Sequence, residues 1–209
     1  TLVPKAAYPQ QVQELNLAVR YVLQNAARWP IDTGRVFLSG DSAGANIVSS
    51  YAAAVNSPEM AAQLQLAAAL APPQLKGLVL HSGVYDIKAL YHGADKAGAI
   101  MSWGAHSMLA QYSGTPQPSD ATLDLMSAYP WLNARFPPVY ISATEVDDMT
   151  ATQTLPLIAR LKALKVPVTA QVYPLSYREA INHDFNFNMR FDASREVFEQ
   201  SMKFLVQHA

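Results

Sequence analysis

The chain has 209 residues, half of them hydrophobic and 15% charged, with a formal net charge of −1 and no cysteine. This composition predicts one globular domain with a sizeable core and excludes a disordered chain, disulfides and thiolate metal sites. No run of Lys and Arg suggests a nucleic-acid partner. The most apolar stretch, residues 64–80, is broken by Pro72, Pro73 and Lys76, so we expect no membrane span.

Strands and helices are expected to alternate along the chain. Short β-branched and aromatic runs between turn residues predict strands at 35–39, 75–82, 137–144 and 167–173. Apolar residues recurring every three or four positions predict helices at 9–27, 45–55, 58–70, 152–165 and 194–207. In the last helix we expect Ser194 as the N-cap and a buried stripe of Val197, Phe198, Met202 and Leu205. The alternation predicts an α/β fold, a mostly parallel sheet with helices on both faces.

The sequence Gly-Asp-Ser-Ala-Gly at 40–44 lies directly between an expected strand and an expected helix. Strand, sharp turn and helix are the context of a nucleophile elbow, in which a serine is exposed on a strained turn at the end of a sheet. Gly40 and Gly44 are both expected because a side chain at either position would collide where strand and helix pass closely. Ser42 is thus the candidate nucleophile, with an ordinary strand–helix turn as the alternative.

A serine hydroxyl needs a base to take its proton and an acid to hold that base. In a parallel sheet, the groups that can meet the elbow follow the carboxyl ends of later strands. Strand 137–144 is followed by Glu145, Asp147 and Asp148, and strand 167–173 by a loop that contains His183. We predict His183 as the base and one of the three carboxylates as the acid.

Four segments resemble the hormone-sensitive-lipase-like esterase group of the α/β-hydrolases. They are residues 2–4 with 8–9, the elbow at 40–46, the acid loop at 145–149, and Asn-His-Asp-Phe at 182–185, which is similar to that group's His-Gly-Phe box. The chain order Ser, acid, His is also that of α/β-hydrolases. The resemblance implies an α/β-hydrolase fold with Asp147 as the catalytic acid. The acid loop departs from the group's pattern, with Thr144 where glycine is common and Asp148 where proline is common, so Asp148 stays an alternative.

The resemblance also implies an oxyanion hole. One donor would be the backbone N–H of Ala43, the residue after the nucleophile. The second would come from a His-Gly-Gly loop that these residues do not contain, so we expect it upstream of Thr1 together with further strands. Residues 1–209 are therefore expected to be a single, N-terminally truncated domain, with a protein that truly lacks this part as the alternative.

Residues 87–135, approximately, are expected to form a small helical cap over the catalytic end of the sheet. No strand pattern occurs there, and its apolar residues would either line an acyl pocket or form the cap's own core. These residues are Ile100, Met101, Trp103, Met108, Leu109 and Tyr112.

The leading hypothesis is a serine carboxylesterase that cleaves esters of small or medium acyl chains through an acyl-enzyme, with no cofactor and no metal. One alternative is an arylformamidase-like amidohydrolase, because residues 82–86 resemble a segment of the kynurenine formamidases. Another is a non-catalytic binding protein of the same fold. The expected partner is a small-molecule ester. A homodimer is left open, as is the compartment, with the cytoplasm slightly favoured.

The other polar residues near these motifs are given ordinary roles. His81, His92, His106 and His208 are expected to be packing or surface histidines, and Asp184 a solvated loop charge.

Overall fold

The computed structural model describes residues 1–96 and 98–209, without the side chain of Met101. Its strands form one parallel sheet in the order β1 (Val36–Asp41), β2 (Leu75–His81), β3 (Val139–Thr144) and β4 (Val168–Tyr173). The predicted α/β fold is confirmed, and the four predicted strand positions match to within two residues. Because the strands are parallel, their carboxyl ends lie along one edge of the sheet.

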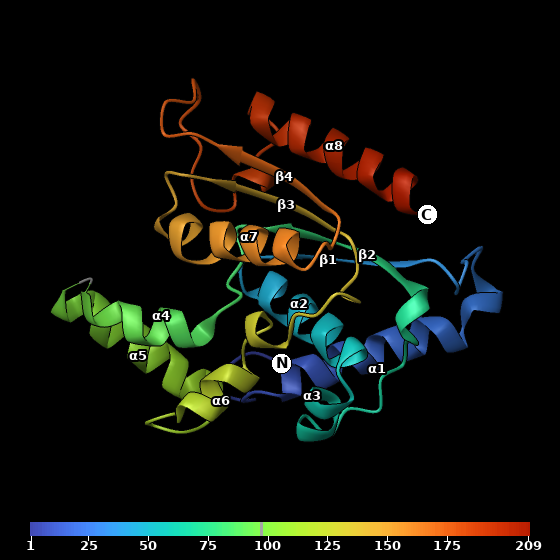
Figure 1. Cartoon of the computed structure of the whole chain (residues 1–209), viewed down its shortest axis with the longest axis horizontal. Helices are drawn as coiled ribbons and strands as arrows, with labels where there is room; N and C mark the ends of the chain where they lie inside the picture. Colours follow the sequence, from blue (N-terminus) through green and yellow to red (C-terminus); the bar gives the residue numbers. More distant parts are fainter. Residues whose placement is uncertain (97) are drawn as a thin grey trace.

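Helices cover both faces of the sheet (Figure 1). Helix α8 (Asp192–His208) lies on one face, and α1 (Gln10–Gln24), α2 (Ala43–Asn56) and α7 (Leu155–Ala163) lie on the other. Strand β2 shows the alternation that this requires: Leu78 and Leu80 belong to the core beneath α2, whereas Val79 belongs to the core beneath α8. The sheet is therefore buried on both sides.

The remaining helices lie in the connections between strands. Between α2 and β2 comes the short α3 (Pro58–Gln63), and between β2 and β3 come α4 (Ile87–Gly93), α5 (Ala99–Ser113) and α6 (Asp120–Leu125). Single 3₁₀ turns are found at Ala26–Arg28, Pro72–Gln74, Ala94–Lys96, Tyr129–Trp131 and Phe185–Phe187. Residues 3–5 form a turn.

The insert between β2 and β3 is helical, as expected, and is bonded to the main body. Asn46 of α2 donates from its amide to the carbonyls of Val84 and Met126, both at 3.1 Å. Tyr112 of α5 donates to the Asn46 side chain at 2.9 Å. The apolar residues of the insert differ in exposure. Leu109 is buried in the main core, whereas Ile100 and Trp103 are exposed. The Met101 side chain lies outside the described part.

Two predicted helices are shorter than expected, and each is ended by a left-handed residue. The helix expected at 58–70 stops at Gln63, because Gln65 takes a φ of 50° and the Leu66 N–H bonds back to the Ala61 carbonyl at 2.8 Å. Helix α7 ends in the same way at Lys165, with a φ of 60°. Neither Gln65 nor Lys165 is a glycine or asparagine, the residues that usually take a left-handed conformation at the C-terminus of a helix.

The prediction for the last helix is wrong in two respects. Helix α8 begins at Asp192, so Ser194 is not its N-cap but a fully buried residue that donates to the Phe185 carbonyl at 2.6 Å. Phe198 and Met202 are 51% and 40% exposed, whereas Phe204 is buried. Phe204 fits because Gly77 of β2 leaves room, since a Cβ there would lie 2.9 Å from its ring. The buried face of α8 includes the small polar residues Ser194 and Ser201, so the spacing of apolar residues alone did not identify this face.

Replacing Ser194 by alanine should lower the free energy of unfolding by about 1–3 kcal/mol, because the buried Phe185 carbonyl loses its only side-chain donor among the described residues. Urea denaturation measures the change. Ser176→Ala, at an exposed position, is the matched control and should change stability by less than about 0.5 kcal/mol. Equal effects of the two substitutions would contradict the anchoring role.

Candidate active site

Ser42 lies in the turn between β1 and α2, where the sequence predicted an elbow. Its backbone takes a φ of 51° and a ψ of −115°, which is a strained conformation for a residue with a side chain. Its N–H bonds to the His81 carbonyl at 2.9 Å, so the turn is tied to the end of β2. The prediction of strand, turn and helix around this serine is confirmed.

The two glycines of the elbow differ in their roles. A Cβ at Gly40 would collide with the Gly44 carbonyl and would lie 2.6 Å from the Ala45 nitrogen. A Cβ at Gly44 would meet nothing within 4 Å. We expected a side chain at either glycine to collide, and this is wrong for Gly44. The backbone of Gly44 is instead the group with which a side chain at Gly40 would collide.

The structure brings three of the predicted residues into one hydrogen-bonded chain. His183 Nε2 lies 2.9 Å from Ser42 Oγ, and His183 Nδ1 lies 2.6 Å from Asp147 Oδ2. The three side chains come from the segments that follow β1, β3 and β4, separated by up to 141 positions in the sequence. With Nδ1–H donating to the carboxylate, Nε2 is left to accept the serine proton.

The Asp147 carboxylate is fixed by burial and by a second hydrogen bond, in addition to its bond to His183. Its side chain is 7% exposed, and its second oxygen, Oδ1, accepts the Met149 N–H at 3.0 Å. The alternatives point elsewhere: Asp148 is exposed, and Glu145 accepts the Leu175 N–H at 3.1 Å. Of the three carboxylates that the sequence left open, the structure brings Asp147 to the imidazole.

His183 lies on a loop whose anchor is Phe185. The Phe185 ring is buried against Tyr173 at 5.4 Å between ring centres, and its carbonyl accepts the Ser194 hydroxyl. The Asn182 side chain accepts the His183 N–H at 2.7 Å. These contacts fix the loop close to the end of β4, where the imidazole can meet the elbow.

Ala43, the expected oxyanion donor, is the first residue of α2. The N–H groups of a first helical turn have no partner within the helix, and the Ser42 side chain makes no capping bond to them. The dipole of α2 adds partial positive charge at this end. Its N–H can therefore donate to an oxygen that develops negative charge beside Ser42.

One residue of the site was not anticipated from the sequence. Gln153 lies in η5 (Thr150–Thr154), a π-helical turn between the acid loop and α7, and is 1% exposed. Its Oε1 accepts the N–H groups of Tyr85 and Asp86 at 2.9 and 2.8 Å. It thereby joins the acid loop to the start of the insert. A glutamine in an apparent helix pattern gives no signal of this role.

The segment at 82–86, which suggested a formamidase, supports the elbow. Tyr85 is fully buried, and a Cβ at Gly83 would lie 2.6 Å from the Ala45 Cβ. Asp86 caps α4 by accepting the Ala89 N–H at 2.8 Å. Packing and capping thus account for residue types that resembled a substrate motif.

The other histidines have the ordinary roles expected of them. His81 is bonded to Ser142 Oγ at 2.6 Å, and burial lowers its pKa to about 4, which keeps it neutral. His92 pairs with Asp120 at 2.8 Å, His106 stacks on Tyr91, and His208 packs on Phe204. Within the described ranges, no three His, Asp or Glu side chains are grouped so as to hold a metal ion.

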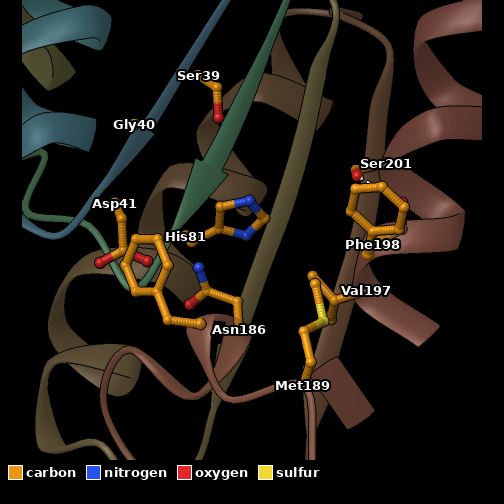
Figure 2. Close-up of a pocket in the computed structure, with 10 residues that line it drawn as sticks. Ser39, Gly40, Asp41, His81, Asn186, Met189, Val197, Phe198 and Ser201 are labelled. Carbon is orange, nitrogen blue, oxygen red and sulfur yellow. Dashed lines mark hydrogen bonds between the residues drawn. The ribbon is translucent and has the colours of Figure 1, made fainter. Parts of the chain in front are cut away.

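A hollow of about 340 Å³ lies next to the end of β1 (Figure 2), and Ser42 is not among the residues that line it. It opens between the end of β1 and α8, and its walls include Asp41, His81, Asn186 and Phe198 but neither Ser42 nor His183. None of the insert residues expected to line an acyl pocket borders it. The hydrogen-bonded chain, not this hollow, therefore defines the candidate site.

Residues 1–183 match a protein family described as having the alpha/beta hydrolase fold. The chain belongs to this family. It is 33% identical over 87 residues to neutral cholesterol ester hydrolase 1 of Bos taurus, and the match covers 41% of this chain and 21% of that protein. The hormone-sensitive-lipase-like resemblance is thereby confirmed.

Solved esterases share the fold of this α/β-hydrolase. Esterase B of Lactobacillus rhamnosis superposes with a TM-score of 0.81 at 21% identity, covering 99% of this chain and 64% of that one. Esterase LipW of Mycobacterium marinum gives 0.71 at 21% identity, covering 100% and 60%. The chain thus spans less than two-thirds of the length of these relatives. In the part of the chain that the structure describes, no helix is long and apolar enough to cross a membrane.

The contrast between the elbow glycines gives a matched test. Gly40→Ala should destabilise the protein by about 3 kcal/mol or more, because its Cβ would meet backbone that cannot rotate away. Gly44→Ala should be neutral or stabilising by up to about 1 kcal/mol, because alanine is the better helix former. Urea unfolding of both variants decides, and similar losses would show that the steric account is wrong.

Proposed function

We propose that this α/β-hydrolase is a serine carboxylesterase in which Ser42, His183 and Asp147 are the catalytic triad. The observation that carries the proposal is the continuous chain from Ser42 Oγ through both imidazole nitrogens to the buried Asp147 carboxylate. A histidine alone beside a serine would be unremarkable. A histidine held by a buried carboxylate and facing a serine on a strained turn is the arrangement that activates a hydroxyl.

The first half-reaction forms an acyl-enzyme. Ser42 Oγ attacks the ester carbonyl carbon while His183 Nε2 takes the hydroxyl proton, and the Asp147 carboxylate stabilises the imidazolium. The carbonyl oxygen becomes an oxyanion and accepts the Ala43 N–H. Loss of one such donor typically costs about 3 kcal/mol of transition-state stabilisation. The C–O bond to the alcohol then breaks, and the leaving oxygen takes the proton from His183.

The second half-reaction restores the serine. Water attacks the acyl carbon, His183 takes the proton of that water, and Ser42 leaves with the proton returned by His183. The balance is one ester and one water to one acid and one alcohol.

Small and medium acyl esters are the proposed substrates, and the helices of residues 87–135 are proposed as a cap beside the serine. Support comes from the position of α4 and α5 beyond the carboxyl ends of the strands (Figure 1) and from their exposed apolar side chains, Ile100, Trp103 and Met108. Exposed apolar groups of this size are typical of surfaces that contact apolar ligands. An ester whose acyl chain is apolar suits such a surface.

An active-site-directed fluorophosphonate tests the nucleophile, because it phosphonylates only activated serines. We expect the purified chain to be labelled at Ser42, as mapped by mass spectrometry, and labelling to be lost in Ser42→Ala and His183→Ala. Ser39→Ala and His92→Ala, which change the same residue types outside the triad, should label like the wild type. Persistent labelling of Ser42→Ala would refute the assignment. Labelling of a longer native form alone would show that an upstream segment completes the site, and no labelling of either this chain or that form would favour a binding protein of this fold.

The neighbouring carboxylates test the acid. Asp147→Asn should lower kcat for p-nitrophenyl butyrate by about 10³- to 10⁴-fold, because the amide favours the wrong imidazole tautomer. Asp148→Asn removes the same charge one residue later, from an exposed side chain, and should lower kcat by less than about threefold. If the two effects are reversed, the acid is Asp148.

A further inference from the structure

Residues 82–86, the entry segment, lead from β2 into the insert. The segment begins with a strained residue, because buried Ser82 takes a φ of 44°. Its N–H bonds to the Ser142 carbonyl at 3.0 Å, at the end of β3. A strained backbone persists only where the surrounding contacts hold it. The hydrogen bonds made by the rest of the entry segment therefore decide whether this conformation is kept.

Gln153 bonds to two consecutive residues of the entry segment through both ends of its amide. Its Oε1 accepts the N–H groups of Tyr85 and Asp86 at 2.9 and 2.8 Å, and its Nε2 donates to the Asp86 carbonyl at 3.2 Å. The Gln153 side chain is buried, so these bonds form away from water. An unpaired donor left in such a place is costly, and the entry segment is correspondingly fixed against Gln153.

A closed turn joins Gln153 to the catalytic acid. Thr150, the first residue of η5, donates from its N–H to the Asp147 carbonyl at 2.8 Å and from its hydroxyl to the Thr144 carbonyl at 2.7 Å. The Asp147 N–H bonds to the same Thr144 carbonyl at 3.0 Å. Gln153 follows Thr150 by three residues in the same π-helical element. The turn that carries Asp147 is therefore bonded, through η5, to the entry segment.

The entry segment is also bonded to the helix that begins after the nucleophile. Asn46 is buried on α2, four residues after Ser42, and donates to the Val84 carbonyl at 3.1 Å. One segment thus contacts α2 on one side and the element that follows Asp147 on the other. The resulting hydrogen-bonded path connects the outer two members of the triad without passing through His183.

The position of Asp147 matters because His183 has a carboxylate near each ring nitrogen. Nδ1 lies 2.6 Å from Asp147 Oδ2, and Nε2 lies 3.1 Å from Oδ1 of Asp184, a partly exposed loop residue. Only a ring protonated on Nδ1 leaves Nε2 free to accept the Ser42 proton. Moving Asp147 away from Nδ1 would favour the other tautomer, which cannot act as the base.

We propose that Gln153 is a positioning residue of the triad: by bonding to the entry segment it holds Asp147 against His183 Nδ1 and keeps the imidazole in the tautomer that can take the serine proton. This inference rests on the proposed esterase function. Gln153 contacts none of the reacting atoms, so its effect on the reaction passes through Asp147. The entry segment in turn becomes part of the support of the acid.

A double-mutant cycle tests whether Gln153 acts through Asp147. Gln153→Met keeps the length of the side chain and removes the amide, so it should lower kcat for p-nitrophenyl butyrate by about 10- to 100-fold per folded molecule. In an Asp147→Asn background the same substitution should lower kcat by less than about twofold, because no carboxylate is left to position. A residue that only stabilises the fold would cost the same factor in both backgrounds.

Gln74→Met is the matched control. Gln74 makes the same kinds of bond, accepting the Ala71 N–H and donating to the Thr33 carbonyl, both at 2.8 Å. It precedes β2 at the edge of the sheet opposite the triad. This variant should lose stability yet keep kcat within about twofold of the wild type. Equal losses for Gln153→Met in the two backgrounds, or a loss no larger than that of Gln74→Met, would overturn the proposal.

Nitrogen NMR of isotope-labelled histidine reads the tautomer without catalysis. At a pH where the ring is neutral, wild-type His183 should carry its proton on Nδ1, and Gln153→Met should shift the population towards Nε2–H. Thr150→Val breaks the next link of the same path in a side chain of the same shape, and it should shift the population in the same direction. It takes the place of Gln153→Met if that variant does not fold, whereas Gln74→Met should leave the signal unchanged.

The NMR outcomes separate this proposal from the esterase assignment. A wild-type His183 protonated on Nε2, or a signal that neither Gln153→Met nor Thr150→Val alters, would refute the positioning role whatever the activity. A shifted signal in a protein that hydrolyses no ester would support the positioning role and count against the proposed function.

Discussion

The close approach of β1 and α2 is the constraint on which the site depends. At Gly40 the strand passes so near the first turn of the helix that no side chain fits between them. The chain must then reverse within Ser42 itself, which accounts for the left-handed backbone of a residue that ordinarily avoids it. The strain at the serine is balanced by the packing of α2, whose residues Tyr51, Ala52 and Ala53 are fully buried. A helix that is this well buried can hold one strained residue at its start.

The parallel sheet brings the other two side chains of the site to the turn that carries Ser42. Every strand delivers its carboxyl end to the same edge, so groups far apart in sequence meet without any special path for the chain. The loops then only have to be fixed against the core. Phe185 does this for the histidine, and the Met149 N–H does it for the carboxylate. The precision of the relay thus comes from hydrophobic anchors beside it rather than from the polar residues alone.

The contrast between hydrophobic anchors and polar site residues explains which features could be predicted from the sequence. Strands, the elbow and the histidine loop are announced by apolar runs and by turn residues, so their positions and order follow from the pattern. The stripe of α8 was misassigned because Ser194 and Ser201 are buried, and a count of apolar residues treats them as exposed. The π-helical turn that carries Gln153 has no sequence signature, since it differs from an α-helix only in its hydrogen bonds.

The Gln153 side chain has a consequence for how the substrate range of such a protein can change. It fastens the base of the insert to the loop that carries Asp147, whereas α5 presents Ile100 and Trp103 to solvent. A substitution at the base would disturb the triad, but one at the outer face of α5 would not reach it. Substitutions on the outer face of α5 can therefore change which ligands bind, while the position of the triad stays unchanged.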